Sequence, residues 1–317
     1  MLPPLSIIHS ASDIATLFFI FGCLLFSIFS LVSVFQFHVK TLKSYLLKDF
    51  NSLWTVRTLL VSFISLWALS ELLRLPILRR YPFPIFGSLT LTQQINLCKI
   101  HVVLTQGFFE PGFLVSLLFI VNISIRKRNP NDTWAMDICL LLSSCLPIFC
   151  LQVFFVFFKP KQEARFTEGF FRSYVIEDED DGGSGTVLCT YPLLGTIIFG
   201  AFAILYIVIF LLSCWRVITL VINKGLRYRI YGLALAVLVA LPTQVLLLGI
   251  SVFWEPSEPA FQLIALAMFL SVLSCALVGE GVLVIKPIVD ALAIDAECCS
   301  WRCDDSSREG NKDTAAI

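Results

Sequence analysis

Seven long runs of apolar residues, almost free of charged side chains, constrain this chain more than any other feature of its sequence. They cover residues 14–37, 55–76, 100–124, 138–158, 191–215, 230–253 and 261–285. Each run is about as long as a helix needs to be to cross roughly 30 Å of hydrocarbon. Hydrophobic residues make up 57% of the chain and charged residues 15%, whereas a soluble domain usually carries about 25% charged residues. The sequence therefore predicts an all-α membrane protein, a seven-transmembrane helix bundle over residues 14–285.

Lys and Arg are distributed unevenly between the two sides of this bundle. The connections after the first, third and fifth runs, together with the tail, carry fourteen of them, and the other side carries seven. Cytoplasmic loops are enriched in Lys and Arg, so we expect residues 1–13 to lie outside the cell and residues 286–317 to form a cytoplasmic tail. The formal net charge of the whole chain is +0, which gives no indication of a nucleic-acid partner.

The connection between the fourth and fifth runs, residues 159–190, is long and acidic. It contains Glu-Asp-Glu-Asp-Asp at 177–181, followed by Gly-Gly-Ser-Gly at 182–185. Blocks of like charge next to glycines resist folding, so we expect a solvated, mobile outer loop. A weak cation site is the alternative, although the spacing is not that of a calcium-binding loop.

Catalytic patterns are missing from the sequence. The three histidines, His9, His38 and His101, fall on opposite sides of the predicted membrane, so they cannot bind one metal ion together. No Gly-x-Ser-x-Gly, His-Glu-x-x-His or phosphate-binding loop is present. No internal repeat of the kind found in many transporters occurs. We therefore expect a protein that is not an enzyme and that uses no cofactor.

Polar side chains inside the runs are few, and such residues often mark functional sites in membrane proteins. Glu71 and Arg74 are three residues apart, so they share a helix face and are expected to form an internal ion pair. Glu110 lies near the middle of the third run, where a carboxyl group must be protonated or paired, and both Arg74 and Gln244 could reach it. The candidate ligand-binding residues in the outer half of the bundle are Arg74, Glu110, Gln244, Glu71, His101 and Trp254, the last two at the rim. A purely structural polar contact is the alternative role for Glu110.

Two pairs of motifs carry a family resemblance. The first pair is Leu-Trp-Thr-Val-Arg at 53–57 and Trp-Ala-Leu-Ser-Glu-Leu-Leu-Arg-Leu-Pro at 67–76, and the second is Asn-Leu-Cys-Lys at 96–99 and Gly-Phe-Phe-Glu-Pro-Gly at 107–112. With these motifs the chain resembles, over nearly its whole length, plant seven-transmembrane proteins described as candidate G-protein-coupled receptors, the phytomelatonin-receptor-like family. The resemblance implies a plasma-membrane receptor-like protein that binds a small ligand, such as the indoleamine melatonin, and contacts a heterotrimeric G-protein α subunit. The switch motifs of rhodopsin-like receptors are missing at 122–128 and 282–287, so their activation mechanism does not carry over.

Five cysteines lie outside the apolar runs, and they suggest two kinds of modification. Cys98 and Cys189 both fall on the predicted outer side, where a disulfide persists. They occupy the positions that pin the second outer loop over the bundle in many animal receptors, so we expect them to be bonded, with two free thiols as the alternative. Cys298, Cys299 and Cys303 are candidates for S-palmitoylation, because residues 286–294 have apolar side chains at helical spacing and could lie along the inner membrane surface. An unmodified tail is the alternative.

Basic residues at the inner ends of the third and sixth runs are the candidate contacts with a G-protein α subunit. They are Arg126, Lys127, Arg128, Arg227 and Arg229. Anionic lipid headgroups attract such residues as well, so membrane anchoring is the alternative. The sequence as a whole predicts a receptor-like protein, and the rival hypothesis is a non-enzymatic membrane scaffold or transport-associated protein that has no ligand.

Overall fold

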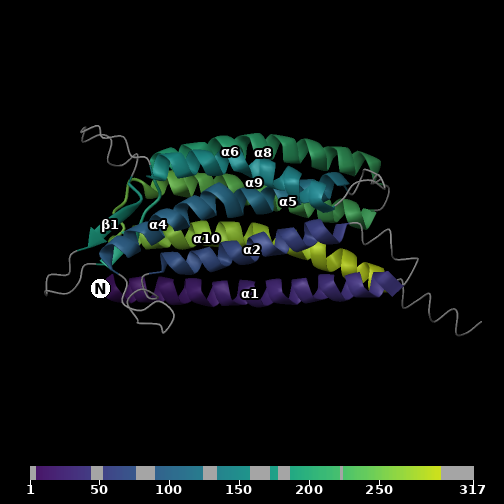
Figure 1. Ribbon diagram of the computed structural model, residues 1–317, viewed down its shortest axis with the longest axis horizontal. Helices are drawn as coiled ribbons and strands as arrows, with labels where there is room; N and C mark the ends of the chain where they lie inside the picture. The colour runs from purple at the N-terminus through teal and green to yellow at the C-terminus, as the bar shows by residue number, and fades with distance from the viewer. Residues whose placement is uncertain are drawn as a thin grey trace, which may run out of the picture.

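The computed structural model describes residues 5–43, 53–75, 90–123, 134–157, 172–177, 186–221 and 224–293. Within these residues, seven helices are long and apolar enough to cross a membrane. Their long axes run in a common direction, and the start of α1 lies at the same end of the bundle as a small β-hairpin (Figure 1). We call this the hairpin end and the other the opposite end. The predicted all-α, seven-helix architecture is confirmed, and the protein is of the multi-pass membrane type.

Six of the seven helices are longer than the apolar runs that predicted them. Their bounds are Leu5–Lys43 for α1, Trp54–Arg74 for α2, Leu91–Leu104 for α4, Glu110–Ile123 for α5, Trp134–Phe157 for α6, Leu193–Leu220 for α8, Lys224–Ser251 for α9 and Pro259–Glu280 for α10. The π-helical turn η3, Thr105–Phe109, joins α4 to α5, and a second one, η5, Gly281–Ile285, follows α10. After η5 the helix continues to residue 293, so residues 286–293 extend the last helix instead of starting a new one. Hydropathy marks only the part of a helix that can lie in lipid, whereas backbone hydrogen bonds carry the helix into polar sequence.

Both π-helical turns stand two residues before a proline, Pro111 and Pro287. The ring of a proline inside a helix clashes with the carbonyl group four residues earlier. Those carbonyl groups belong to Gly107 and Leu283, which lie inside η3 and η5. The wider π winding accommodates the prolines, because it moves these carbonyl groups out of the normal α-helical position. In η3 this places Glu110 directly after the widened turn.

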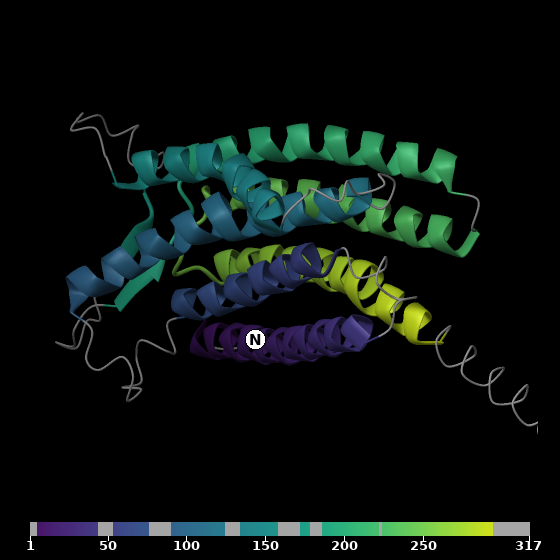
Figure 2. The same ribbon diagram turned by 45° about the vertical axis from the view of Figure 1, so that its right-hand side comes forward.

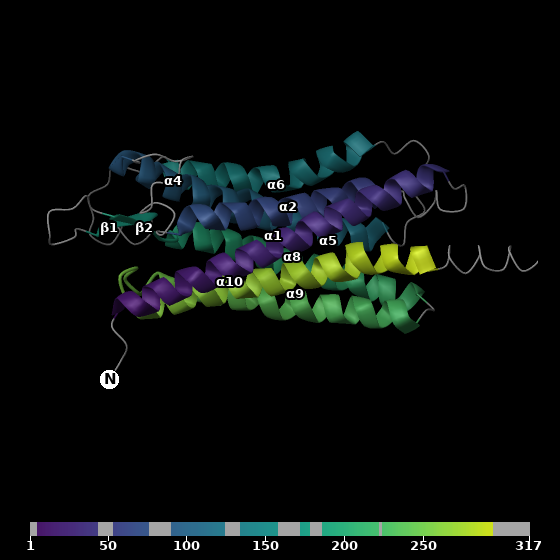
Figure 3. The same ribbon diagram turned by 90° about the horizontal axis from the view of Figure 1, so that it is seen from below.

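The third helix, formed by α4, η3 and α5, lies at the centre of the bundle. Its apolar stretch is 72% buried, against 17% for α6. It packs against α2, α6 and α8, while α9 packs between α8 and α10, and α1 covers α2 and α10. Figure 2 shows α1 and α2 on one side of the third helix and α6 and α8 on the other. In Figure 3, α1 runs obliquely across its neighbours.

The outward faces of the peripheral helices are apolar. Phe18 on α1 is 73% exposed, Ile204 on α8 is 70% exposed, and Leu246 on α9 is 66% exposed. Soluble proteins rarely expose apolar patches of this extent. These faces match a hydrocarbon surrounding, while the polar side chains described below face inward.

A two-stranded antiparallel hairpin caps one end of the bundle. It pairs β1, Tyr174–Glu177, with β2, Thr186–Cys189, in a register that sets Tyr174 opposite Cys189. The expectation of an unstructured loop over 159–190 was therefore wrong for these flanks, because β-branched and aromatic residues favour strands. The acidic and glycine residues at 178–185 lie outside the described residues.

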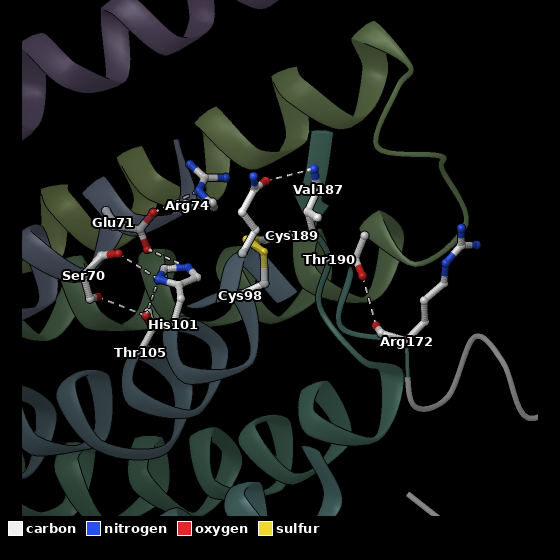
Figure 4. Close-up of a disulfide and its surroundings, with 11 residues drawn as sticks. Ser70, Glu71, Arg74, Cys98, His101, Thr105, Arg172, Val187, Cys189 and Thr190 are labelled. Atoms are coloured by element: carbon white, nitrogen blue, oxygen red, sulfur yellow. Dashed lines mark hydrogen bonds and ion pairs between the residues drawn. A yellow bond between two sulfur atoms is a disulfide. The ribbon is translucent and has the colours of Figure 1, made fainter. Parts of the chain in front are cut away.

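The predicted disulfide is confirmed. Cys98 on α4 and Cys189 at the end of β2 are bonded, with their Cα atoms 5.2 Å apart and a separation of 91 positions in the sequence. The Gln94 side-chain carbonyl also accepts a 3.4 Å hydrogen bond from the Val187 backbone N–H. Both links fasten the hairpin to the central helix (Figure 4).

Gly112 allows α5 to pack closely against α2. A Cβ atom at Gly112 on α5 would lie 2.5 Å from Cε1 of the buried Phe63 ring on α2. Gly112→Ala should therefore lower the free energy of unfolding by about 1–3 kcal/mol through overpacking. Gly249→Ala on α9 is the matched control, because nothing lies within 4 Å of its new Cβ, and it should raise stability by up to roughly 1 kcal/mol through helix propensity. Thermal unfolding in detergent measures both, and shifts of the same sign would contradict the close packing of α2 on α5.

Candidate functional site

Glu110 lies at the meeting point of three helices. It begins α5 and is only 4% exposed. Its Oε1 accepts a 3.3 Å hydrogen bond from Trp67 Nε1 on α2, and its Oε2 accepts a 2.7 Å bond from Gln244 Nε2 on α9. The predicted contact with Gln244 is therefore present. Burying a carboxyl group is costly unless it has hydrogen-bond partners, and here each oxygen has one.

The predicted ion pair between Glu71 and Arg74 is also present. Arg74 Nε lies 3.1 Å from Glu71 Oε2, with the residues three positions apart on α2. Both side chains are largely shielded from solvent, so each charge compensates the other where water does not.

His101 connects this ion pair to the central helix. Its Nδ1 lies 2.8 Å from the Ser70 backbone carbonyl oxygen and 3.3 Å from the Thr105 hydroxyl. A carbonyl oxygen only accepts, so Nδ1 carries a proton and donates it to Ser70. The other ring nitrogen, Nε2, lies 3.9 Å from Glu71 Oε1 (Figure 4).

The expected position of His101 at the rim was wrong. Its side chain is 0% exposed. The reason is that α4 continues outward beyond His101, where the hairpin packs against it and Cys98 is bonded to β2. His101 therefore belongs to the interior of the bundle.

Three of the predicted ligand-binding residues line one cavity: Glu71, Glu110 and Gln244. The cavity has a volume of about 20 Å³, which is room for about one water molecule. Its other lining residues are Trp67, Gln106, Tyr191, Leu248, Ala265, Met268, Phe269 and Val272. The polar members come from α2, η3, α5, α9 and the residues just before α8, so this wall is assembled from most of the bundle.

Arg74 lines a second cavity, nearer the hairpin. That cavity also measures about 20 Å³ and includes Asp13, Cys189 and Gln262 in its wall. Ala265 belongs to both cavities, so they are neighbours. Trp254 lines neither of these two and is 44% exposed just after α9. The structure thus brings together Glu71, Glu110 and Gln244, and leaves Trp254 apart.

Sequence reasoning missed three polar members of the first cavity: Trp67, Gln106 and Tyr191. Gln106 is 1% exposed, and neither its Oε1 nor its Nε2 has a hydrogen-bond partner. Its spacing of four residues from Glu110 was an available signal, because such residues share a helix face. Trp67 and Tyr191 had no comparable signal, since aromatic residues are common throughout the apolar runs.

Of the candidate partner-binding residues, Arg227 and Arg229 are described. Arg229 Nη1 lies 2.6 Å from Asp290 Oδ2 beyond η5, and Arg227 Nη2 donates a 3.0 Å hydrogen bond to the Val221 carbonyl. The charge of Arg229 is therefore locally compensated. Two further groups of candidates lie outside the described residues: Arg126, Lys127 and Arg128, and the palmitoylation candidates Cys298, Cys299 and Cys303.

Comparisons with known proteins place the chain in a family. None of the curated proteins matches it. One family model, described as uncharacterised conserved protein UCP031277, matches residues 2–299, which is nearly the whole chain. The chain belongs to this family, the uncharacterised conserved proteins UCP031277.

Proposed function

We propose that this protein is a receptor-like seven-span protein of the plasma membrane. It binds a small ligand at the hairpin end of the bundle and couples at the opposite end to a G-protein α subunit. The observation that carries the proposal is the convergence of Glu71, Glu110 and Gln244, from three helices, on one buried cavity. Pockets for small molecules typically combine an apolar wall with a few convergent polar groups. The uneven distribution of Lys and Arg supports an outer location for the hairpin end.

Glu110 is the proposed primary contact of the ligand. Its two oxygens accept hydrogen bonds from neutral N–H groups of Trp67 and Gln244, so a ligand N–H or ammonium group would find an acceptor there. Trp67 stacks on Phe269 with a centroid distance of 5.3 Å, and this pair presents an aromatic wall to a flat ring such as an indole. An indoleamine such as melatonin combines these two chemistries.

Helix α9 is the proposed link between the two ends of the protein. Gln244 on α9 holds Glu110, and Arg229, fifteen positions earlier on the same helix and about 22 Å away, pairs with Asp290. The cavity has room for about one water molecule. A larger ligand must therefore move some of the side chains that line it. A ligand that replaces Gln244 as the partner of Glu110 would release α9 and shift its opposite end.

A membrane scaffold without a ligand is the second candidate function. The small volume of the cavity, about 20 Å³, favours it, because such a space holds about one water molecule and no organic ligand. The hydrogen bonds of Glu110 then serve only to fix the positions of α2, α5 and α9 relative to one another. The two candidates differ in whether a small molecule binds the purified protein.

Melatonin binding to the purified full-length protein tests the receptor proposal. Glu110→Gln keeps the side-chain shape but removes the carboxylate, and hydrogen bonds to charged groups contribute about 1.5–3 kcal/mol. We therefore expect at least a roughly tenfold loss of affinity. Glu280→Gln is the matched control, because Glu280 is equally buried but bonds Ser27 on α1 and lines neither cavity. It should bind as the wild type does. Equal affinity of Glu110→Gln and wild type would remove Glu110 from the site, and no binding to wild type would favour the scaffold.

Association of the protein with a G-protein α subunit is a second measurement that tests the receptor proposal. Arg227 on α9 is exposed, and Arg227→Glu should weaken the association several-fold if the opposite end docks an acidic surface. Antibody access to the C-terminal tail only after permeabilising the cells would keep the proposed orientation intact. An accessible tail on intact cells would contradict it, and unchanged association would leave Arg227 as a membrane anchor.

A further inference from the structure

The first cavity, which is lined by Glu71, Glu110 and Gln244, has many oxygen-bearing side chains in its wall. Oxygen-bearing side chains reach its wall from five places in the chain: Glu71, Gln106, Glu110, Tyr191 and Gln244. Gln244 uses its Nε2 to bond Glu110, so its amide oxygen is not engaged in that bond. Hard cations prefer carboxylate, amide and hydroxyl oxygens as ligands.

The Gln106 side chain has no hydrogen-bond partner within the part of the protein that the structure describes. Its side chain is 1% exposed, and both of its polar atoms lack a hydrogen-bond partner. Buried polar atoms without partners are rare in native proteins and call for an explanation. Gly195 on α8 keeps the surroundings of this amide open, because a Cβ there would lie 3.4 Å from Gln106 Oε1 and 2.9 Å from Gln152 Oε1.

The charges around the cavity do not balance within the protein. Glu71 is paired with Arg74 at 3.1 Å. Glu110 receives hydrogen bonds only from the neutral N–H groups of Trp67 and Gln244. His101 directs one nitrogen to the Ser70 carbonyl and the other toward Glu71. When Glu110 is ionised, its carboxylate therefore has no cation partner among these side chains, and burial in that state would be costly.

The size of the cavity restricts what can supply the missing charge. A volume of about 20 Å³ admits one water-sized particle. Among the described residues no group of three or more His, Cys, Asp or Glu side chains is arranged to hold a metal ion. Two carboxylates, one of them already paired, suit a single positive charge better than a divalent ion.

We propose that this cavity is a binding site for a monovalent cation of the size of sodium, held by Glu110 with the Gln106 and Gln244 amide oxygens. The cation balances Glu110 and gives Gln106 its partner. Bound there, it ties η3, α5 and α9 together around one charge. The site uses the same cavity as the proposed ligand pocket but does not depend on any organic ligand.

Thermal unfolding of the purified full-length protein tests this site, with NaCl compared to choline chloride at equal ionic strength and without any organic ligand. Choline is too large for the cavity, so only sodium can bind. At sodium concentrations about ten times the Kd, the added stability corresponds to a roughly elevenfold change in the unfolding equilibrium, or a rise in Tm on the order of 2–4 °C. The rise should saturate with sodium concentration. Equal Tm values in the two salts would overturn the proposal.

Three variants test whether the sodium-dependent rise in Tm arises from this cavity. Glu110→Gln removes the charge and should abolish the sodium-dependent rise in Tm, whereas Glu280→Gln, at a buried carboxyl outside the cavity, should retain it in full. Gln106→Leu removes an amide oxygen without touching a charge, and it should reduce the rise even if Glu110→Gln does not fold. A rise that survives in both Glu110→Gln and Gln106→Leu would place sodium elsewhere and overturn the proposal. Because melatonin is absent throughout, failure of the ligand-binding experiment and failure of this one are independent results.

Discussion

Trp67→Ala is expected to lower the free energy of unfolding by about 3–5 kcal/mol, the range for truncating a large buried aromatic side chain. Trp67 is 1% exposed and is the largest of the fully buried side chains among the described residues. Its ring stacks on Phe269 of α10 with an interplanar angle of 12°, and its Nε1–H donates to Glu110 of α5. The substitution therefore removes packing between α2 and α10 and a polar contact between α2 and α5 at once.

Trp67→Phe separates these two contributions. Phe keeps an aromatic ring against Phe269 but has no N–H group for Glu110. The expected loss is about 1.5–3 kcal/mol, the contribution of a hydrogen bond to a charged group. Thermal and denaturant unfolding in detergent measure both variants. If Trp67→Ala and Trp67→Phe lose the same stability, the stacking on Phe269 contributes nothing, and the role assigned to that pair as the wall of the cavity is wrong.

Removing the disulfide should have an effect of similar size. The double variant Cys98→Ser with Cys189→Ser opens a link that spans 91 residues, and loss of a native disulfide typically costs about 2–4 kcal/mol. The chain-entropy model predicts about 4.6 kcal/mol for so long a loop, which lies above this range. Helices that persist in the denatured state reduce that entropy gain, so the middle of the range is the expected result.

The disulfide prediction has two controls. Cys139→Ser changes a free, exposed cysteine on α6 and should leave the Tm within about 1 °C of the wild type, because surface substitutions have small effects. Wild-type protein treated with a reductant should match the double variant. A double variant as stable as the oxidised wild type would show that the β1–β2 hairpin is held to α4 by other contacts, such as the bond from the Val187 N–H to Gln94.

The amino-acid sequence alone determined the features that depend on neighbours along the chain. The number of spans follows from runs of apolar residues, and the Glu71–Arg74 pair follows from a three-residue spacing on one helix. The Cys98–Cys189 bond joins distant positions. It was predicted because the distribution of basic residues put both cysteines on one side and because many animal receptors have a link at these positions.

The composition of the cavity was decided by the tertiary structure. Which side chain meets Glu110 depends on the rotation and depth of α2 and α9 against α5, and no local pattern encodes either. The π-helical turn η3 changes the register just before Glu110, and the hairpin buries His101, which the sequence placed at the rim. Tyr191 joins the cavity only through the packing of separate helices. Contacts within one helix follow from its fixed period, whereas contacts between helices follow from packing of whole surfaces, which becomes defined only when all seven helices are assembled.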